Sequence, residues 1–267
     1  IVLCTFAPAA TATAQQRPPA SVGAPTPNNK IDDLVFAQLK RASLQPAPLS
    51  TDAVFLRRAY IDVIGVLPTA DEVRAFLDDR STDKRSRLID QLLERDEFAD
   101  YSAMKWSDVL RVKSEFPINL WPNAVQAYHH WIRASLRDNV PYDQFARELL
   151  TESGSNFRVP QVNFYRALQS RDPQAVAAVA ALTFMGTRTD LWPKERVAQM
   201  AAAFSQIGYK PTREWKEEIV FFDPARPFPG SEPGASRTIA FPDGTTAKLS
   251  PDQDPRDAFA AWLTAPN

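Results

Sequence analysis

The stretch that decides the fold is FLRRAYIDVIGVLPTADEV, residues 55–73, in which apolar side chains recur at helical spacing and then stop at a glycine. This spacing predicts one apolar face of a helix, with Ser50 as its cap and with Gly65 and Pro68 as signals for its end. The next four residues, Thr69-Ala70-Asp71-Glu72, form a capping box that predicts the start of another helix. The segment therefore predicts two short helices joined by a tight turn.

Helical spacing continues on both sides of this segment, and a different pattern follows Gly208, which we interpret as a helix stop. Glu218–Phe222 then predicts a strand, and Pro242-Asp243-Gly244 predicts a hairpin turn between two further strands. We therefore predict a mainly α fold, a multi-helix domain followed by a small β-hairpin-containing connector. The other expected helices cover residues 31–39, 81–93, 97–112, 123–138, 141–150, 173–185, 193–207 and 255–263.

The chain begins with an uncharged, apolar segment that ends in Ala12-Thr13-Ala14, which is typical of the remnant of a secretory signal peptide. A signal peptide implies export, so we expect the protein in the periplasm or outside the cell. The expected segments are a signal remnant (1–14), a Pro/Ala-rich linker (15–29), a helical domain (30–210), a β-containing connector (211–253) and the first helix of a second domain that continues past the last residue (254–267).

Composition excludes several classes of function. The formal net charge is −1, so we expect no nucleic-acid partner, and no later stretch approaches membrane-spanning length. Cys4, the only cysteine, lies inside the signal segment, so the mature part has no thiolate for a metal or a covalently attached haem. His129 and His130 are adjacent and would point about 100° apart on a helix. We therefore predict no metal site and no cofactor.

Carboxylates supply two candidate catalytic residues, Asp62 and Asp108. Asp62 would lie beside the apolar stripe of its helix, with Arg58 four positions earlier and within pairing reach. A structural pairing is the commoner role for such a group, so we assign Arg58, Asp62, Gly65 and Pro68 to a structural motif. Paired carboxylates can also flank a glycosidic bond, but two on one helix, such as Glu148 and Glu152, more often form a solvated face.

Aromatic side chains gather in the middle of the chain. Trp106, Asp108 and Arg111 form W-x-D-x-x-R on an expected helix, and Trp121, Tyr128 and Trp131 follow closely. Aromatic rings beside polar groups can hold sugar rings, because the apolar face of a sugar stacks on an aromatic ring. The alternative is that these rings are half-buried wedges between helices. The candidate binding residues are Trp106, Asp108, Arg111 and Trp131.

The run LRRAYIDVIGVLPT, residues 56–69, resembles a known family. Its pattern, LRR-x-x-x-D-x-x-G-x-x-P, is similar to that of the planctomycete-type, cytochrome-associated exported domain of unknown function, the first of two uncharacterised domains in large bacterial proteins. Similar agreement occurs at Lys30-Ile31-Asp32, at residues 106–111 (WSDVLR) and at residues 141–145 (PYDQF). The end of the chain, residues 254–267, resembles the opening of the second domain.

The resemblance implies an exported protein that occurs near polysaccharide-degradation genes or fused to cytochrome c modules. Many relatives carry a C-x-x-C-H-like segment where this chain has Phe184-Met185-Gly186-Thr187-Arg188, so this member lacks the residues for a haem role. We expect a non-catalytic binding or assembly module associated with polysaccharide breakdown, with a glycan or other exported proteins as partners. The alternatives are a carboxylate-dependent hydrolase completed by a further C-terminal domain, and an electron-transfer partner of a cytochrome.

Overall fold

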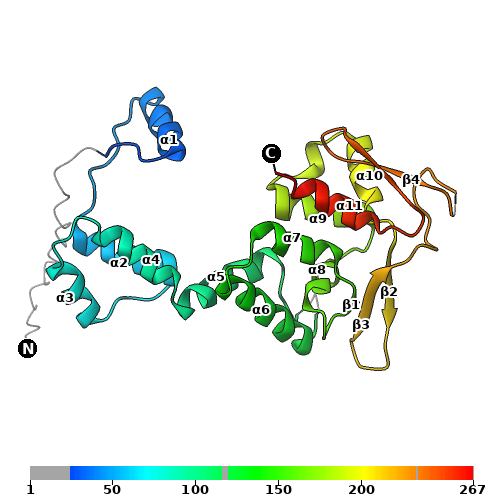
Figure 1. Ribbon diagram of the computed structural model, residues 1–267, viewed down its shortest axis with the longest axis horizontal. Coiled ribbons are helices and arrows are strands. Elements are labelled where there is room, and N and C mark those ends of the chain that lie inside the picture. The colour runs from blue at the N-terminus through cyan, green and yellow to red at the C-terminus, as the bar shows by residue number, and fades with distance from the viewer. Residues whose placement is uncertain (1–24, 116–119, 233, 267) are drawn as a thin grey trace, which may run out of the picture. The chain divides into compact units, whose positions relative to one another are not determined.

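A computed structural model describes residues 25–115, 120–232 and 234–266 (Figure 1). Helices dominate these residues and the sheets are small and antiparallel, which confirms the predicted mainly α class. The chain forms two compact units, divided between Leu93 and Glu94. The expected signal remnant and most of the linker lie outside the described residues, and the predicted domain boundaries stay predictions. In the described part of the chain, no helix has the length and apolar character needed to cross a bilayer.

The described residues of the first unit, from 25 onward, form four helices: α1 (Lys30–Arg41), α2 (Asp52–Ile64), α3 (Ala70–Asp78) and α4 (Lys84–Leu93). Its small core forms between the apolar faces of α2, α3 and α4, where Leu56, Phe76 and Leu92 are buried. Both predicted local signals are confirmed. Gly65 ends α2 in the left-handed conformation, with φ of 73°, and Thr69 forms the capping box with Glu72.

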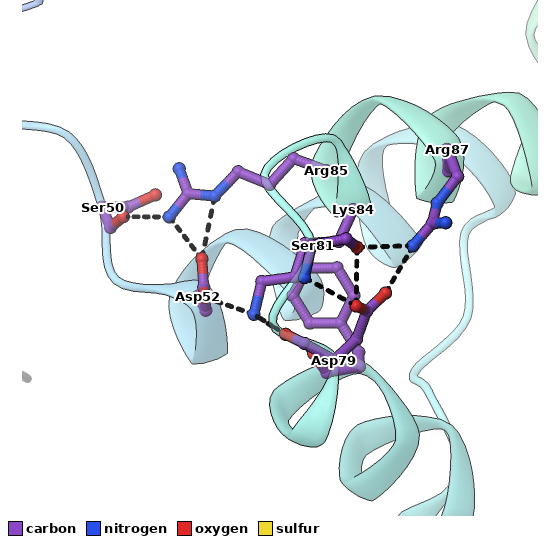
Figure 2. Close-up of polar contacts among 8 residues, drawn as sticks. Ser50, Asp52, Asp79, Ser81, Lys84, Arg85 and Arg87 are labelled. Atoms are coloured by element: carbon purple, nitrogen blue, oxygen red, sulfur yellow. Dashed lines mark hydrogen bonds and ion pairs between the residues drawn. The ribbon is translucent and has the colours of Figure 1, made fainter.

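The start of α2 is fixed by an ionic network rather than by a capping hydroxyl (Figure 2). Thr51, not the predicted Ser50, precedes the helix, and its side chain makes no capping hydrogen bond. Asp52 instead forms an ion pair with Lys84 Nζ at 2.7 Å. It also accepts hydrogen bonds from Arg85 Nε and Nη2 at 2.9 and 2.7 Å. The cap prediction was wrong because the first-turn carboxylate has two cationic partners from α4.

A second part of the same network closes the connection between α3 and α4. Asp79 accepts hydrogen bonds from the backbone and hydroxyl of Ser81 and pairs with Arg87, while Lys84 Nζ donates to the Asp79 carbonyl at 2.8 Å (Figure 2). The basic residues of this cluster thus have partners, and a cavity of about 290 Å³ beside Lys84 and Arg87 is bordered by paired charges. We interpret the cluster as a structural pin.

The second unit has a larger core. The helices are α5 (Asp96–Val109), α6 (Pro122–Arg137), α7 (Tyr142–Thr151), α8 (Asn163–Arg166), α9 (Pro173–Met185), α10 (Lys194–Ala202) and α11 (Pro255–Leu263), with 3-10 turns η1 (Pro160–Val162) and η2 (Thr189–Leu191). Ile132, Leu149, Phe164 and Phe204 are fully or almost fully buried where these helices meet. The small side chains of α9, such as Ala180, let that helix pack closely against α10.

The described part of this unit also contains two antiparallel sheets. The first has the order β1 (Gly154–Ser155), β3 (Glu218–Phe222), β2 (Ile207–Pro211), and the second is the predicted hairpin of β4 (Arg237–Ala240) and β5 (Thr246–Leu249). The predicted helix through Ile207 is wrong, because α10 ends at Ala202. Gly208 is not a helix stop. It lies in β2 and pairs with Phe221 of β3, and a Cβ at position 208 would lie 2.6 Å from the Phe221 ring.

The last helix, α11, belongs to the core of the second unit as far as the structure describes it. Phe259 and Ala260 are buried there, and α11 packs on α7. Arg256 is 1% exposed and pairs with Asp254 at 2.7 Å, and it also donates to the Glu152 carbonyl at 3.1 Å. The buried charge is therefore neutralised, which such burial requires.

Candidate functional site

Two tryptophans from distant parts of the chain meet on the surface of the second unit. Trp121 precedes α6 and is 39% exposed, and Trp215 lies in the loop between β2 and β3 and is 66% exposed. Their ring centroids are 6.5 Å apart and their planes are inclined by 82°. We call this pair the indole corner. Large aromatic side chains gain free energy from burial, so two adjacent exposed ones mark a candidate interaction surface.

The loop that carries Trp215 is held by the buried carboxylate of Glu217, which is 8% exposed. Ser155 Oγ donates to this carboxylate, and Thr212 Oγ1 donates to it at 2.6 Å. The Thr212 amide also donates to the Glu217 carbonyl at 3.2 Å. The hydrogen bond from Ser155, and then that from Thr212, lowers the pKa of Glu217 from its usual range. The loop is therefore pinned at its base while Trp215 stays exposed.

Strand β3, which follows this loop, is held in place by a second carboxylate, that of Glu218. Glu218 accepts two hydrogen bonds from Arg171, at 3.0 and 2.9 Å, and pairs with Arg166 at 2.9 Å. The Glu218 amide donates to Asn156 Oδ1 at 2.8 Å. Bidentate arginine contacts restrict orientation as well as distance. The β2–β3 hairpin is consequently anchored to α8 and to the segment after β1. The fold of the second unit therefore fixes the position of Trp215.

Trp121 has an unusual backbone conformation, with φ of 72° and ψ of 147°. Positive φ is costly for a residue with a Cβ, by about 1–3 kcal/mol, and such residues cluster at functional sites. Leu120 on one side is fully buried, and Pro122 on the other occupies the first turn of α6. These neighbours hold the backbone so that the Trp121 ring reaches the surface beside Trp215.

The candidate aromatic residues Trp106 and Trp131 do not join the indole corner. The ring of Trp131 stacks on Phe145 with centroids 4.7 Å apart, and its Nε1 donates to Glu148 at 3.3 Å. Trp106 contacts Phe145 and Tyr142 at 5.3 and 6.0 Å and borders a separate cavity of about 180 Å³. Both rings therefore pack between helices, and Trp106 also lines a pocket.

The expected helical motif W-x-D-x-x-R is interrupted. α5 ends at Val109, and Arg111 has a φ of 59°, so Asp108 and Arg111 do not share a helix face as expected. Asp108 is exposed, and Arg111 borders a pocket that Trp106 does not line. The motif was misjudged because the chain turns left-handed at Arg111, at a position where glycine is the usual signal.

The structural motif around Asp62 also differs from expectation. Asp62 and Arg58 are both exposed on α2. No ion pair links the two within the described ranges. Gly65 ends the helix as predicted, and Pro68 lies in the turn that follows. Asp62 and Asp108 belong to different units.

The remaining polar candidates are Glu148, His129 and His130. Glu148 accepts hydrogen bonds from Trp131, Gln144 and Gln161. His129 and His130 lie with ring centroids 6.3 Å apart and an interplanar angle of 62°. Among the residues that the structure describes, no group of three or more histidine, cysteine, aspartate or glutamate side chains is arranged to hold a metal ion.

Residues 30–207 match the model of a protein family described as protein of unknown function DUF1549, also termed PSCyt2. The chain belongs to the DUF1549 family. Trp121 lies inside the matched region of this DUF1549 protein, and Trp215 lies after it. None of the curated proteins or solved structures gives a significant match. The indole corner was missed from sequence because its two residues are 94 positions apart and no local pattern joins them.

Proposed function

We propose that this DUF1549 protein is a non-catalytic binding module of an exported apparatus for polysaccharide breakdown, and that its indole corner contacts sugar rings. The observation that carries the proposal is the exposed pair of Trp121 and Trp215 on an anchored loop. Export rests on the character of residues 1–14, and the planctomycete-type and cytochrome-associated setting rests on the family resemblance.

The geometry of the corner suits a saccharide. Sugar rings present an apolar C–H face that packs on an aromatic ring, while their hydroxyls keep hydrogen bonds with polar neighbours or water. Two indoles inclined by 82° offer one plane for such a face and a second wall beside it. Arg213, Glu214 and Lys216 flank Trp215 and can supply donors and acceptors for hydroxyls.

Rigidity supports binding rather than a chance exposure of apolar surface. Glu217 and Glu218 tie the loop and its strand to the rest of the unit, so little conformational entropy is left to lose when a ligand binds. These two carboxylates are engaged in holding the platform. Neither of them is therefore free to face a glycosidic bond.

Calorimetric titration of the whole chain with a panel of soluble polysaccharides tests the proposal. We expect binding to at least one polysaccharide, weakened about fivefold or more by Trp215→Ala and by Trp121→Ala, since one lost stacking contact is worth about 1 kcal/mol. Tyr142→Ala is the matched control, because Tyr142 is an exposed aromatic residue that lies away from the indole corner, at the pocket lined by Trp106. Affinities equal in all variants, or no binding to any polysaccharide by the folded chain, would reject it.

A further inference from the structure

Arg111 occupies a backbone position that is unfavourable for its side chain. It follows Leu110, the C-cap of α5, and its φ is 59°. The Arg111 amide donates to the Asp108 carbonyl at 3.3 Å, and the Val112 amide to the Ser107 carbonyl at 2.9 Å, which is a helix end that usually uses glycine. A side chain costs about 1–2 kcal/mol there. The chain thus carries a long cationic group where the smallest residue would be more stable.

The guanidinium of Arg111 has no neutralising partner among the described residues. It is half-buried, and its Nη1 is buried without a hydrogen bond within that part of the chain. Burial lowers the pKa of Arg111, with no carboxylate to oppose the effect. Arg166 and Arg256 differ, since each pairs with a carboxylate, Glu218 and Asp254. The Tyr128 hydroxyl beside Arg111 is also buried and unpaired within the described residues.

A pocket of about 310 Å³ has Arg111 in its lining. It lies between the end of α5, the segment after α8 and the first turns of α9. Leu168, Ala175 and Val179 supply apolar wall, and Gln169 and Ser170 supply polar groups. The volume is at the lower end of the range for small-molecule sites, and mostly apolar walls with few polar groups are their usual composition.

We propose that this pocket binds a small aliphatic carboxylate, with the carboxylate against Arg111 and the hydrocarbon against Leu168, Ala175 and Val179. A carboxylate matches the planar, bidentate donor geometry of a guanidinium. A single cation lines the pocket, so a monoanion is neutralised, whereas a dianion would leave one charge uncompensated against apolar walls. The site shares no residue with the indole corner and does not depend on the proposed glycan binding.

The test is calorimetric titration of the whole chain with hexanoate, with the neutral analogue hexanamide and with inorganic sulfate. We expect hexanoate to bind and the other two to bind at least about tenfold more weakly, because hexanamide lacks the charge and sulfate lacks the apolar body. Arg111→Gly is expected to lose hexanoate binding while its melting temperature is unchanged or higher, since glycine tolerates the positive φ. This variant separates a lost site from a lost fold.

A second variant keeps the charge and fills the space. Ala175→Phe places a ring in the pocket and is expected to weaken hexanoate binding about tenfold or more with Arg111 intact. Ala198→Phe, at an exposed position of α10, is the matched control and should bind as the parent does. Absence of hexanoate binding, equal affinity for sulfate, or binding that survives both Arg111→Gly and Ala175→Phe would overturn the proposal.

Discussion

Ser155 donates a hydrogen bond to the carboxylate of Glu217, which lies 62 residues later in the chain. The contact joins β1 to the loop that presents Trp215, and Thr212 completes the pin from within the loop. Glu217 therefore holds the loop between β2 and β3 in place and so fixes the position of Trp215. Its carboxylate is buried, so its loss should affect both stability and the position of the indole corner.

Replacing Glu217 with Gln should destabilise the second unit. The variant keeps the size of the side chain but weakens charge-assisted hydrogen bonds from Ser155 and Thr212, so we expect a loss of about 1–2 kcal/mol in the free energy of unfolding. Urea unfolding monitored by circular dichroism measures it. Glu214→Gln, an exposed carboxylate of the same loop, should change stability by less than about 0.5 kcal/mol. Equal effects in the two variants would contradict the role of Glu217.

The Glu217 contribution should depend on pH in a defined direction. Its pKa is lower in the folded protein than the usual value, so the stabilisation is complete above the unfolded pKa of about 4.3 and is lost as the pH falls through the folded pKa. The stability difference between the parent and Glu217→Gln should therefore be constant from about pH 7 to 5 and shrink below about pH 4. Unfolding curves at several pH values measure this, and a difference that grows on acidification would be inconsistent with it.

In the first unit, Asp52→Asn should remove the ionic anchor between α2 and α4. Hydrogen bonds from Lys84 and then Arg85 lower the pKa of Asp52, but the group is one-third exposed, so we expect a loss of only about 1 kcal/mol. Asp62→Asn is the control on the same helix, because Asp62 is exposed and should have little effect. Thermal unfolding of both variants distinguishes them, and a larger effect from Asp62→Asn would refute the assignment.

Gly208 is predicted to be required for the approach of Phe221. A methyl group at this position would lie 2.6 Å from the ring, so Gly208→Ala should cost about 1–3 kcal/mol of stability. Phe221→Leu removes the obstructing ring, and the double variant should recover part of the loss. A double-mutant cycle from urea unfolding gives the coupling energy. Strict additivity of the two effects would show that the contact does not restrict position 208.

The sequence predicts the structural features that depend on residues close together in the chain. Gly65 and the Thr69 capping box fix helix ends through contacts a few residues away, and the apolar run at Glu218–Phe222 predicts its strand. Strand β2 escaped prediction because residues 203–207 continue the apolar pattern of α10, and only pairing with β3 defines the strand. Its conformation depends on partners that lie later in the chain.

The same distinction explains the sites. The tryptophans near residue 106 attracted attention because they are close in sequence, yet Trp131 packs on Phe145. The indole corner forms between Trp121 and Trp215, which only the folded hairpin brings together. Arg111 was singled out from sequence, but the left-handed turn that directs it to its own pocket gives no signal without a glycine.

The most direct measurement of the central claim is the shift of the tryptophan indole N–H resonances in ¹H–¹⁵N spectra during titration with the polysaccharide that binds. The resonances of Trp121 and Trp215, assigned from the alanine variants, should move together and saturate with the calorimetric affinity. Those of Trp131 and Trp262, which donate to Glu148 and Asp243, should stay in place. Binding that leaves the Trp121 and Trp215 signals unchanged would contradict the indole corner as the sugar-binding surface.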